Sequence, residues 1–235
     1  MTGFRTSPVH VRLVECHARF ATVLGMPAAV EIGTADAQRV AVAAVVDVSC
    51  LDRTGLKGPG AAAWLAERGI PVPGQPNRWC ASGEDGLVAR LARTEFLLEG
   101  AGSSPLVPLA RAGLRAGIEG VYPVLRQDCA LLLAGERVPE LLAQTCNVDL
   151  SGQDEAQAVV TLTQMVGVSV TILRQRLAGR AVWRVWCDYA NGPYLWETLA
   201  GIAEELGGGP AGIAAAWPAL GADGTVATTT GGQGR

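Results

Sequence analysis

Residues 57–66 read Lys-Gly-Pro-Gly-Ala-Ala-Ala-Trp-Leu-Ala, and residues 134–143 read Ala-Gly-Glu-Arg-Val-Pro-Glu-Leu-Leu-Ala. Aligned at an offset of 77 positions, the two stretches place Gly58 on Gly135 and one apolar helix pair on the other. Each stretch is followed by strand-rich sequence and then by a predicted helix with a proline in its first turn, where the missing N–H group costs nothing. The repetition predicts two copies of one unit, residues about 40–117 and 121–207, that meet at a shared seam.

The repeated unit alternates strands with helices. β-branched runs at residues 40–46, 159–164 and 166–173 predict strands. Helical patterns occur in each half, at residues 60–68, 105–116, 138–146 and 193–206. Hairpins inside each half favour antiparallel pairing over parallel crossovers. The sequence therefore predicts an α+β fold of duplicated β-α-β-β-α halves with mostly antiparallel sheets. We expect one domain over residues 1–218 and a flexible Gly/Thr-rich C-terminal tail over residues 219–235.

Composition excludes several classes of function. The net charge is −3, and Lys57 is the only lysine among 19 basic residues, so there is no basic field for nucleic acid. No apolar run approaches the roughly 20 residues of a membrane helix, and the N-terminus lacks a secretion signal. Six scattered cysteines form no metal-binding pair. We expect a cytoplasmic protein that contains no metal and that binds neither nucleic acid nor membranes.

Four stretches resemble, in order, the folate-binding domain of the glycine-cleavage aminomethyltransferases. Residues 47–65 resemble the opening Asp-x-Ser-x-Leu and Gly-Pro motifs of that family, and residues 85–98 resemble its hairpin. Residues 126–135 match the next strand and turn, and residues 194–199, Tyr-Leu-Trp-Glu-Thr-Leu, match the C-terminal helix. Within the family, the order of the pieces is most similar to the gamma subunit of heterotetrameric sarcosine oxidases.

The resemblance implies an accessory subunit of a folate-linked N-demethylating flavoenzyme complex. Its partners would be larger flavoprotein subunits, and flavin would be present only through such a partner. The resemblance leaves open a stand-alone aminomethyltransferase-like protein, which would act on a tetrahydrofolate C1 unit or on a lipoylated carrier protein. A stand-alone folate-binding regulator is a third possibility. Whether the chain is itself an enzyme stays open.

Asp85 is the catalytic residue that the resemblance implies. In the resembled enzymes an aspartate at the start of the hairpin meets the pterin and the reacting nitrogen, and a carboxylate there can hold a cationic amine. The alternative is an ordinary acidic turn before Gly86. Gly86 also stands where the enzymes carry leucine, and residues 174–180 replace their Gly-Tyr-Thr-Gly-Glu loop. Both departures weaken the expectation of folate binding.

Five further side chains are predicted to bind a ligand. Arg184 and Trp186 share one face of the predicted strand 181–187, where they could stack a flat ligand or bind a carboxylate. Asp47 and Ser49 form a polar cluster in the loop of the first half, and Arg126 lies in the corresponding loop of the second half. The alternatives are core packing for the strand residues and capping for the loop residues.

Overall fold

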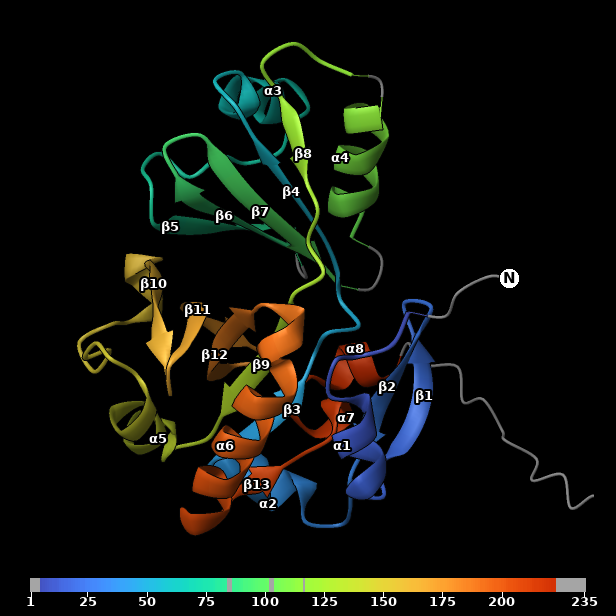
Figure 1. Ribbon diagram of the computed structural model, residues 1–235, viewed down its shortest axis with the longest axis vertical. Helices are drawn as coiled ribbons and strands as arrows, with labels where there is room; N and C mark the ends of the chain where they lie inside the picture. Colours follow the sequence, from blue (N-terminus) through green and yellow to red (C-terminus); the bar gives the residue numbers. More distant parts are fainter. Residues whose placement is uncertain (1–4, 84–85, 102–103, 116, 223–235) are drawn as a thin grey trace, which may run out of the picture.

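The computed structural model describes residues 5–83, 86–101, 104–115 and 117–222. Three sheets contain two, five and six strands, and every strand pairing except β13 with β3 is antiparallel. Figure 1 shows two lobes stacked one on the other, each with a sheet and covering helices. The predicted α+β class with mostly antiparallel sheets is confirmed.

The upper lobe in Figure 1 contains the five-stranded sheet, in the order β5-β6-β7-β4-β8. Its elements are β4 (Asp52–Lys57), α3 (Ala61–Glu67), β5 (Arg78–Ser82), β6 (Gly86–Ala92), β7 (Glu95–Gly100), α4 (Leu106–Arg115) and β8 (Tyr122–Val124). Helices α3 and α4 bury their apolar residues, among them Leu65 and Val107, against Phe96 and Leu98 of β7. This cluster is the core of the upper lobe.

The lower lobe contains the six-stranded sheet, in the order β10-β11-β12-β9-β3-β13. Its elements are β3 (Ala44–Asp47), β9 (Cys129–Ala134), α5 (Val138–Thr145), β10 (Val160–Met165), β11 (Val168–Leu177), β12 (Arg180–Cys187), α6 (Gly192–Glu205) and β13 (Gly209–Pro210). Two short 3₁₀ turns, Glu155–Gln157 and Tyr189–Asn191, connect these elements. Leu141 of α5 and Trp196 of α6 pack against Leu131 and Val185 on the outer face of the sheet.

The N- and C-terminal segments pack beside the lower lobe. They comprise α1 (His10–Glu15), the hairpin β1 (Arg19–Val23) and β2 (Met26–Glu31), α2 (Asp36–Val42), α7 (Ile213–Ala216) and α8 (Pro218–Ala222). Asp36 ties them together, because its Oδ2 accepts hydrogen bonds from the backbone N–H groups of Ile32 and Gly212. No helix within the described ranges is both long and apolar enough to cross a membrane.

The two large sheets share one order of elements. Strand, helix, three strands and helix follow one another in β4-α3-β5-β6-β7-α4 and again in β9-α5-β10-β11-β12-α6. The strand that precedes each of these sets in the chain pairs with the other sheet. Strand β3 precedes β4 but pairs with β9, whereas β8 precedes β9 but pairs with β4. The linkers that follow β3 and β8 therefore both cross the seam between the sheets.

Gly58 and Gly135 make this arrangement possible. Both have a positive φ, +128° and +131°. A Cβ at Gly58 would lie 2.2 Å from the carbonyl oxygen of Gly120, and one at Gly135 would lie 2.3 Å from that of Val42. These carbonyls belong to the segments that lead into the exchanged strands β8 and β3. Only glycine permits both the backbone conformation and the close approach.

Two predicted boundaries differ from the structure, and one strand is not predicted. The unpredicted strand is β5, in the first half. Residues 40–42 end a helix, because the strand begins only where Ala44 pairs with Gly209 and Ala134. Helix α8 extends to Ala222, four residues into the predicted tail, because Leu220 is buried in the core. Residues 223–235 lie outside the described part of the chain.

Candidate functional site

A buried ionic cluster occupies the seam between the two sheets. Arg53 and Glu99 are opposite each other in the β4–β7 pairing, and Nε of Arg53 donates to Oε2 of Glu99 at 2.7 Å. From the other sheet, Arg184 pairs with Glu99 Oε1, and Nε1 of Trp186 donates to Oε2 at 2.8 Å. Glu99 is 1% exposed, Arg184 2% and Arg53 4%. We name Glu99, Arg53, Arg184, Trp186 and Trp217 the Glu99 cluster.

The arginines of the cluster make further contacts within the protein, although Nε of Arg184 is buried without a hydrogen-bond partner among the described residues. Arg53 donates to the backbone oxygens of Asp128, at 2.8 Å, and of Val48, at 3.2 Å, so it joins both linkers that cross the seam. The Arg184 guanidinium lies 5.4 Å from the ring of Trp186 and 5.3 Å from that of Trp217. Contacts of this kind stabilise a desolvated cation. The cluster therefore joins β4, β7, β12, both linkers and the C-terminal segment.

Glu99 stays ionised in this setting. Burial alone would raise its pKa, but the charges of Arg184 and Arg53 and the Trp186 hydrogen bond outweigh burial and lower the pKa of Glu99. A buried carboxylate with two arginines and an indole donor is a satisfied structural group. In this arrangement Arg184 and Trp186 both face the seam, where their polar groups contact Glu99. Their role in ligand binding stays a prediction.

A small cavity lies at the start of the β6 hairpin, where the resemblance implies a pterin. We name it the hairpin-start cavity; its lining includes Trp79, Gly86, Gln175, Arg184 and Trp217, and its volume is about 70 Å³. Pockets for small molecules usually measure roughly 300–1,000 Å³. A Cβ at Gly86 would lie 2.4 Å from the carbonyl oxygen of Ser82, so leucine does not fit there. The described residues thus do not form a pterin pocket at this place, and Asp85 lies outside them.

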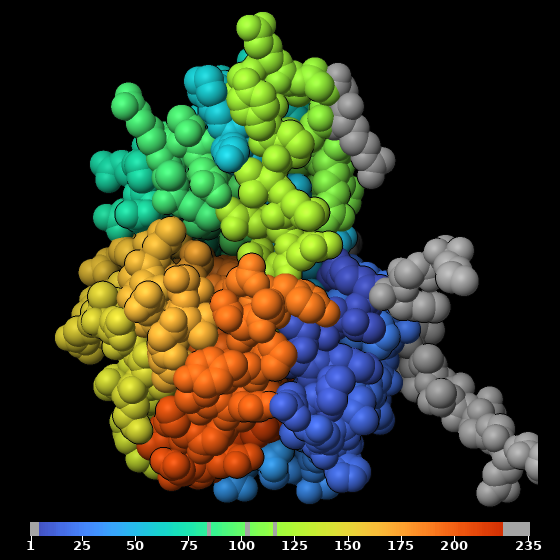
Figure 2. Space-filling model, viewed as in Figure 1, coloured from blue at the N-terminus to red at the C-terminus, as the bar shows by residue number. Residues whose placement is uncertain are grey.

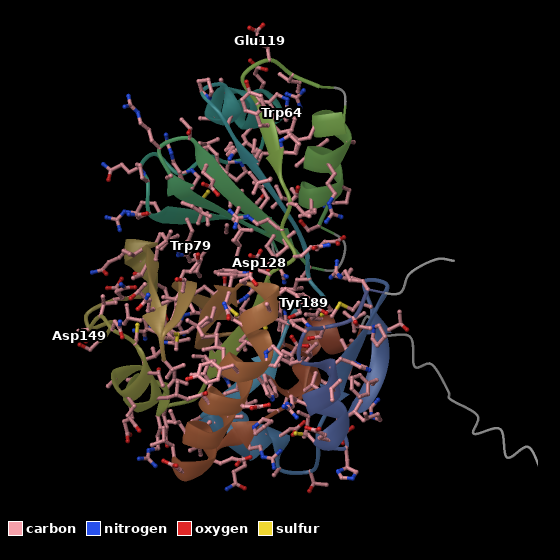
Figure 3. All side chains as sticks on the ribbon, in the orientation of Figure 1. Trp64, Trp79, Glu119, Asp128, Asp149 and Tyr189 are labelled. Carbon is pink, nitrogen blue, oxygen red and sulfur yellow. The ribbon has the colours of Figure 1, made fainter. Side chains whose placement is uncertain are left out.

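Two larger cavities flank the linker between β8 and β9. One, of about 530 Å³, lies between the sheets and is lined by residues of β10, β11 and β12, by Leu97 of β7 and by the linker; we name it the seam cavity. The other, of about 320 Å³, includes Arg5, Ser49 and Tyr189. Arg126 and Asp128 line both cavities. Figure 3 shows Asp128 between the two lobes and Tyr189 close below it.

Asp128 is the least satisfied polar group of this region. Its Oδ1 is 3.9 Å from Nη1 of Arg126, and its Oδ2 is buried without a hydrogen-bond partner among the described residues. Burial raises the pKa of Asp128, against the opposing charges of Arg126 and Arg53. Arg126 is itself paired with Glu95 at 2.8 Å. Asp128 therefore lacks a close counter-charge beside two cavities.

Asp47 and Ser49 stabilise the loop after β3. Oδ1 of Asp47 accepts a hydrogen bond from the Ser49 backbone N–H at 3.0 Å, and Oγ of Ser49 accepts one from the backbone of Ala130 at 3.0 Å. Burial raises the pKa of Asp47. Ser49 also lines the 320 Å³ cavity, as Arg126 does, whereas Asp47 is buried away from it. The structure thus brings Ser49 and Arg126 to one cavity and Trp186 and Arg126 to the other.

The sequence does not indicate Glu99 as the centre of the seam. It does place Asp128 beside Arg126, in the loop that corresponds to the loop of Asp47, but only Arg126 of the two is predicted to bind a ligand. Glu99 gave no local signal, because a charge at the end of a strand usually faces solvent. Within the described ranges, no cluster of three or more His, Cys, Asp or Glu side chains is suited to hold a metal ion.

Comparisons with known proteins identify the fold. No family model matches the chain, and no curated protein matches it in sequence. The glycine cleavage system aminomethyltransferase T from Bartonella henselae is similar, with a TM-score of 0.67 and 18% identity over 91% of this chain and 61% of that one. The chain thus spans about three fifths of the length of that enzyme. A chain of the heterotetrameric sarcosine oxidase from Corynebacterium sp. U-96, in complex with pyrrole 2-carboxylate, gives a TM-score of 0.63 and 18% identity over 87% of this chain and 97% of that one. The chain therefore has an aminomethyltransferase-like fold.

Proposed function

We propose that this chain is an accessory subunit, similar to the sarcosine oxidase gamma subunit, of a folate-linked N-demethylating flavoenzyme complex. The observation that carries the proposal is the Glu99 cluster, whose buried side chains fill the middle of the seam. The hairpin-start cavity beside it, about 70 Å³, is too small for a pterin. A fold whose expected cofactor site is filled by its own side chains is suited to a structural role.

The likeness to the sarcosine oxidase chain supports the same proposal. The match covers 97% of that chain, and the sarcosine oxidase is a heterotetramer, so a chain of this fold occurs within a larger assembly. In our proposal larger flavoprotein subunits hold the flavin, the complex is cytoplasmic, and this chain contributes no metal.

A second candidate is favoured by one observation, the size of the seam cavity. At about 530 Å³ it lies within the usual range for small-molecule pockets, and Trp186 forms part of its wall. A stand-alone aminomethyltransferase-like protein could hold a tetrahydrofolate C1 unit there, with Arg126 and Trp186 as ligand-binding residues. Such a protein could receive the C1 unit from a lipoylated carrier protein.

Co-expression and calorimetry distinguish the two. The chain is produced alone and together with any flavin amine-oxidase-like proteins found to be encoded beside its gene, and assembly is followed by size-exclusion chromatography. The accessory role predicts co-elution with these proteins and no heat of tetrahydrofolate binding to the isolated chain. Micromolar tetrahydrofolate binding to the isolated chain would instead support the second candidate. Loss of this binding in Arg126→Ala would support the seam cavity as its place, whereas loss in Asp85→Ala would support the start of the hairpin and a role for Asp85. Failure to assemble with any such partner counts against the first.

We also propose that the two halves descend from one duplicated unit. The common order of elements and the matching roles of Gly58 and Gly135 support this. The halves contain three strands between their helices, one more than the β-α-β-β-α pattern in the sequence analysis. The duplication predicts that a rotation of nearly half a turn superimposes residues 52–115 on residues 129–205. If no such rotation superimposes them, the duplication is contradicted.

A further inference from the structure

The seam cavity and the hairpin-start cavity lie at corresponding places in the two lobes. Ala81 of β5 pairs with Leu87 of β6 beside the hairpin-start cavity, and Leu162 of β10 pairs with Thr171 of β11 beside the seam cavity. The hairpin-start cavity is largely filled by four side chains, Trp79, Gln175, Arg184 and Trp217. No corresponding set of large side chains fills the seam cavity, so about 530 Å³ remains open.

The charged groups around the seam cavity leave a net negative charge. Arg126 is neutralised by Glu95, at 2.8 Å. Asp128 is 3.9 Å from Arg126, too far for a hydrogen bond, and its Oδ2 has no partner among the described residues. Asp188 adds a second carboxylate, of which Oδ1 caps the next turn by accepting from Ala190 N–H at 2.9 Å. Two aspartates and one neutralised arginine favour a cation in the cavity.

The uncharged lining is divided between acceptors and apolar surface. Hydroxyl or amide groups come from Gln164, Ser169 and Thr171, and apolar surface comes from Leu97 and Leu162. Hydroxyl oxygens can accept hydrogen bonds from an ammonium group, and the apolar side chains can cover an alkyl chain. The opening is wide, since Leu162 is 53% exposed at the edge of the sheet. Figure 2 shows the linker after β8 reaching down to the start of α6 beside this region.

We propose that the seam cavity binds a small protonated alkylamine. Its ammonium group pairs with Asp128 and Asp188, and its alkyl chain lies against Leu97 and Leu162. The inference does not depend on the proposed function, because both walls of the cavity belong to this chain.

Calorimetric titration of the purified full chain with butylammonium chloride at pH 7 tests the proposal. Butyrate and butan-1-ol, which have the same alkyl chain with a negative or no charge, serve as ligand controls. Saturable binding of butylammonium is expected, with binding of either control at least about tenfold weaker, since a charge-assisted hydrogen bond is lost. Asp128→Asn and Asp188→Asn should each weaken butylammonium binding by about tenfold or more. Asp149→Asn, at a carboxylate of a different hollow, should leave it unchanged.

One further variant tests the proposal even if Asp128→Asn fails to fold. Leu162→Lys changes an exposed side chain and places a cation at the cavity edge, so it should also weaken binding without loss of fold. Circular dichroism establishes that each variant is folded. The proposal is wrong if butylammonium does not saturate the protein, if butyrate binds equally well, or if folded Asp128→Asn and Leu162→Lys both bind as the wild type does.

Discussion

Glu99 and Trp186 stand at corresponding positions of the two large sheets and are hydrogen-bonded to each other at 2.8 Å. Glu99 is opposite Arg53 in the β4–β7 pairing, and Trp186 is opposite Ala130 in the β9–β12 pairing. Arg53 and Ala130 are separated by 77 positions, the offset that relates Gly58 to Gly135. In the proposed duplication, one place thus carries a carboxylate in one half and an indole donor in the other.

This difference makes the halves complementary. A buried carboxylate is costly unless it is paired and hydrogen-bonded, and the lower sheet supplies both a cation, Arg184, and a donor, Trp186. Buried polar networks can favour one packing arrangement over others. We infer that the Glu99 cluster fixes how one sheet is placed on the other. Its hydrogen bonds and ion pairs form in full only when both lobes are folded.

Glu99→Gln should therefore cost about 3–5 kcal/mol of the free energy of unfolding, because it leaves Arg53 and Arg184 buried without a counter-charge. Urea unfolding followed by tryptophan fluorescence measures this. Glu95→Gln is the matched control: Glu95 is also paired with an arginine, but its side chain is 35% exposed, so the expected cost is about 0–1 kcal/mol. Equal costs in the two variants would contradict a special role for Glu99.

The pH dependence of the Glu99 effect follows from its lowered pKa. A carboxyl whose pKa is lower in the folded protein binds protons more weakly there than in the unfolded chain, so its stabilisation is present above the unfolded value, about 4.5. The difference in stability between wild type and Glu99→Gln should be constant near neutral pH and should shrink as the pH falls below about 4.5. Urea titrations at several pH values test this, and a difference that grows on acidification has the wrong sign.

Alanine substitutions measure how strongly Gly58 and Gly135 require glycine. Gly58, Gly135 and Gly167 all have positive φ, but a Cβ at Gly167 would meet nothing within 4 Å. Gly167→Ala should cost about 1–2 kcal/mol, the strain of the left-handed region alone. Gly58→Ala and Gly135→Ala should cost more, because their φ near +130° lies outside that region and the added methyl group also meets a backbone carbonyl of the neighbouring segment. Thermal and urea unfolding measure the costs; similar values for all three would mean that the close approach relaxes cheaply.

Local sequence signals predicted much of this fold. Gly58 and Gly135 mark the turns before α3 and α5, and the hairpin between β6 and β7 turns at Arg93 and Thr94 as its sequence indicates. Strand β5 was missed because Arg78–Ser82 is mostly half-exposed and lacks an apolar run. The exchange of β3 and β8 has no local signal either, because which sheet a strand joins is decided by distant residues.

The site was harder to predict than the fold for the same reason. Residues 95–100, Glu-Phe-Leu-Leu-Glu-Gly, indicate a strand with a charge near each end. Of the two glutamates, only Glu99 is buried. Its partners Arg184 and Trp186 are 85 and 87 positions away. Alternation did place Arg184 and Trp186 on one strand face, yet it could not show that Glu99 stood opposite them.

Asp128 should show a pH effect opposite in sign to that of Glu99. Burial raises the pKa of Asp128 in the folded protein, so above the unfolded pKa its charged form destabilises the fold. The groups that act on it are Arg126, Arg53 and Glu99. Asp128→Asn should therefore be at least as stable as the wild type at pH 7, and this advantage should disappear as the pH falls to about 4. Asp149→Asn is the control, because the backbone N–H of Ser151 lowers the pKa of Asp149, and its removal should destabilise at pH 7. Urea unfolding of both variants at pH 4 and pH 7 measures the signs. A loss of stability in Asp128→Asn at pH 7 would mean that Arg126 compensates the buried charge in full, and the seam cavity would then lack its acidic wall.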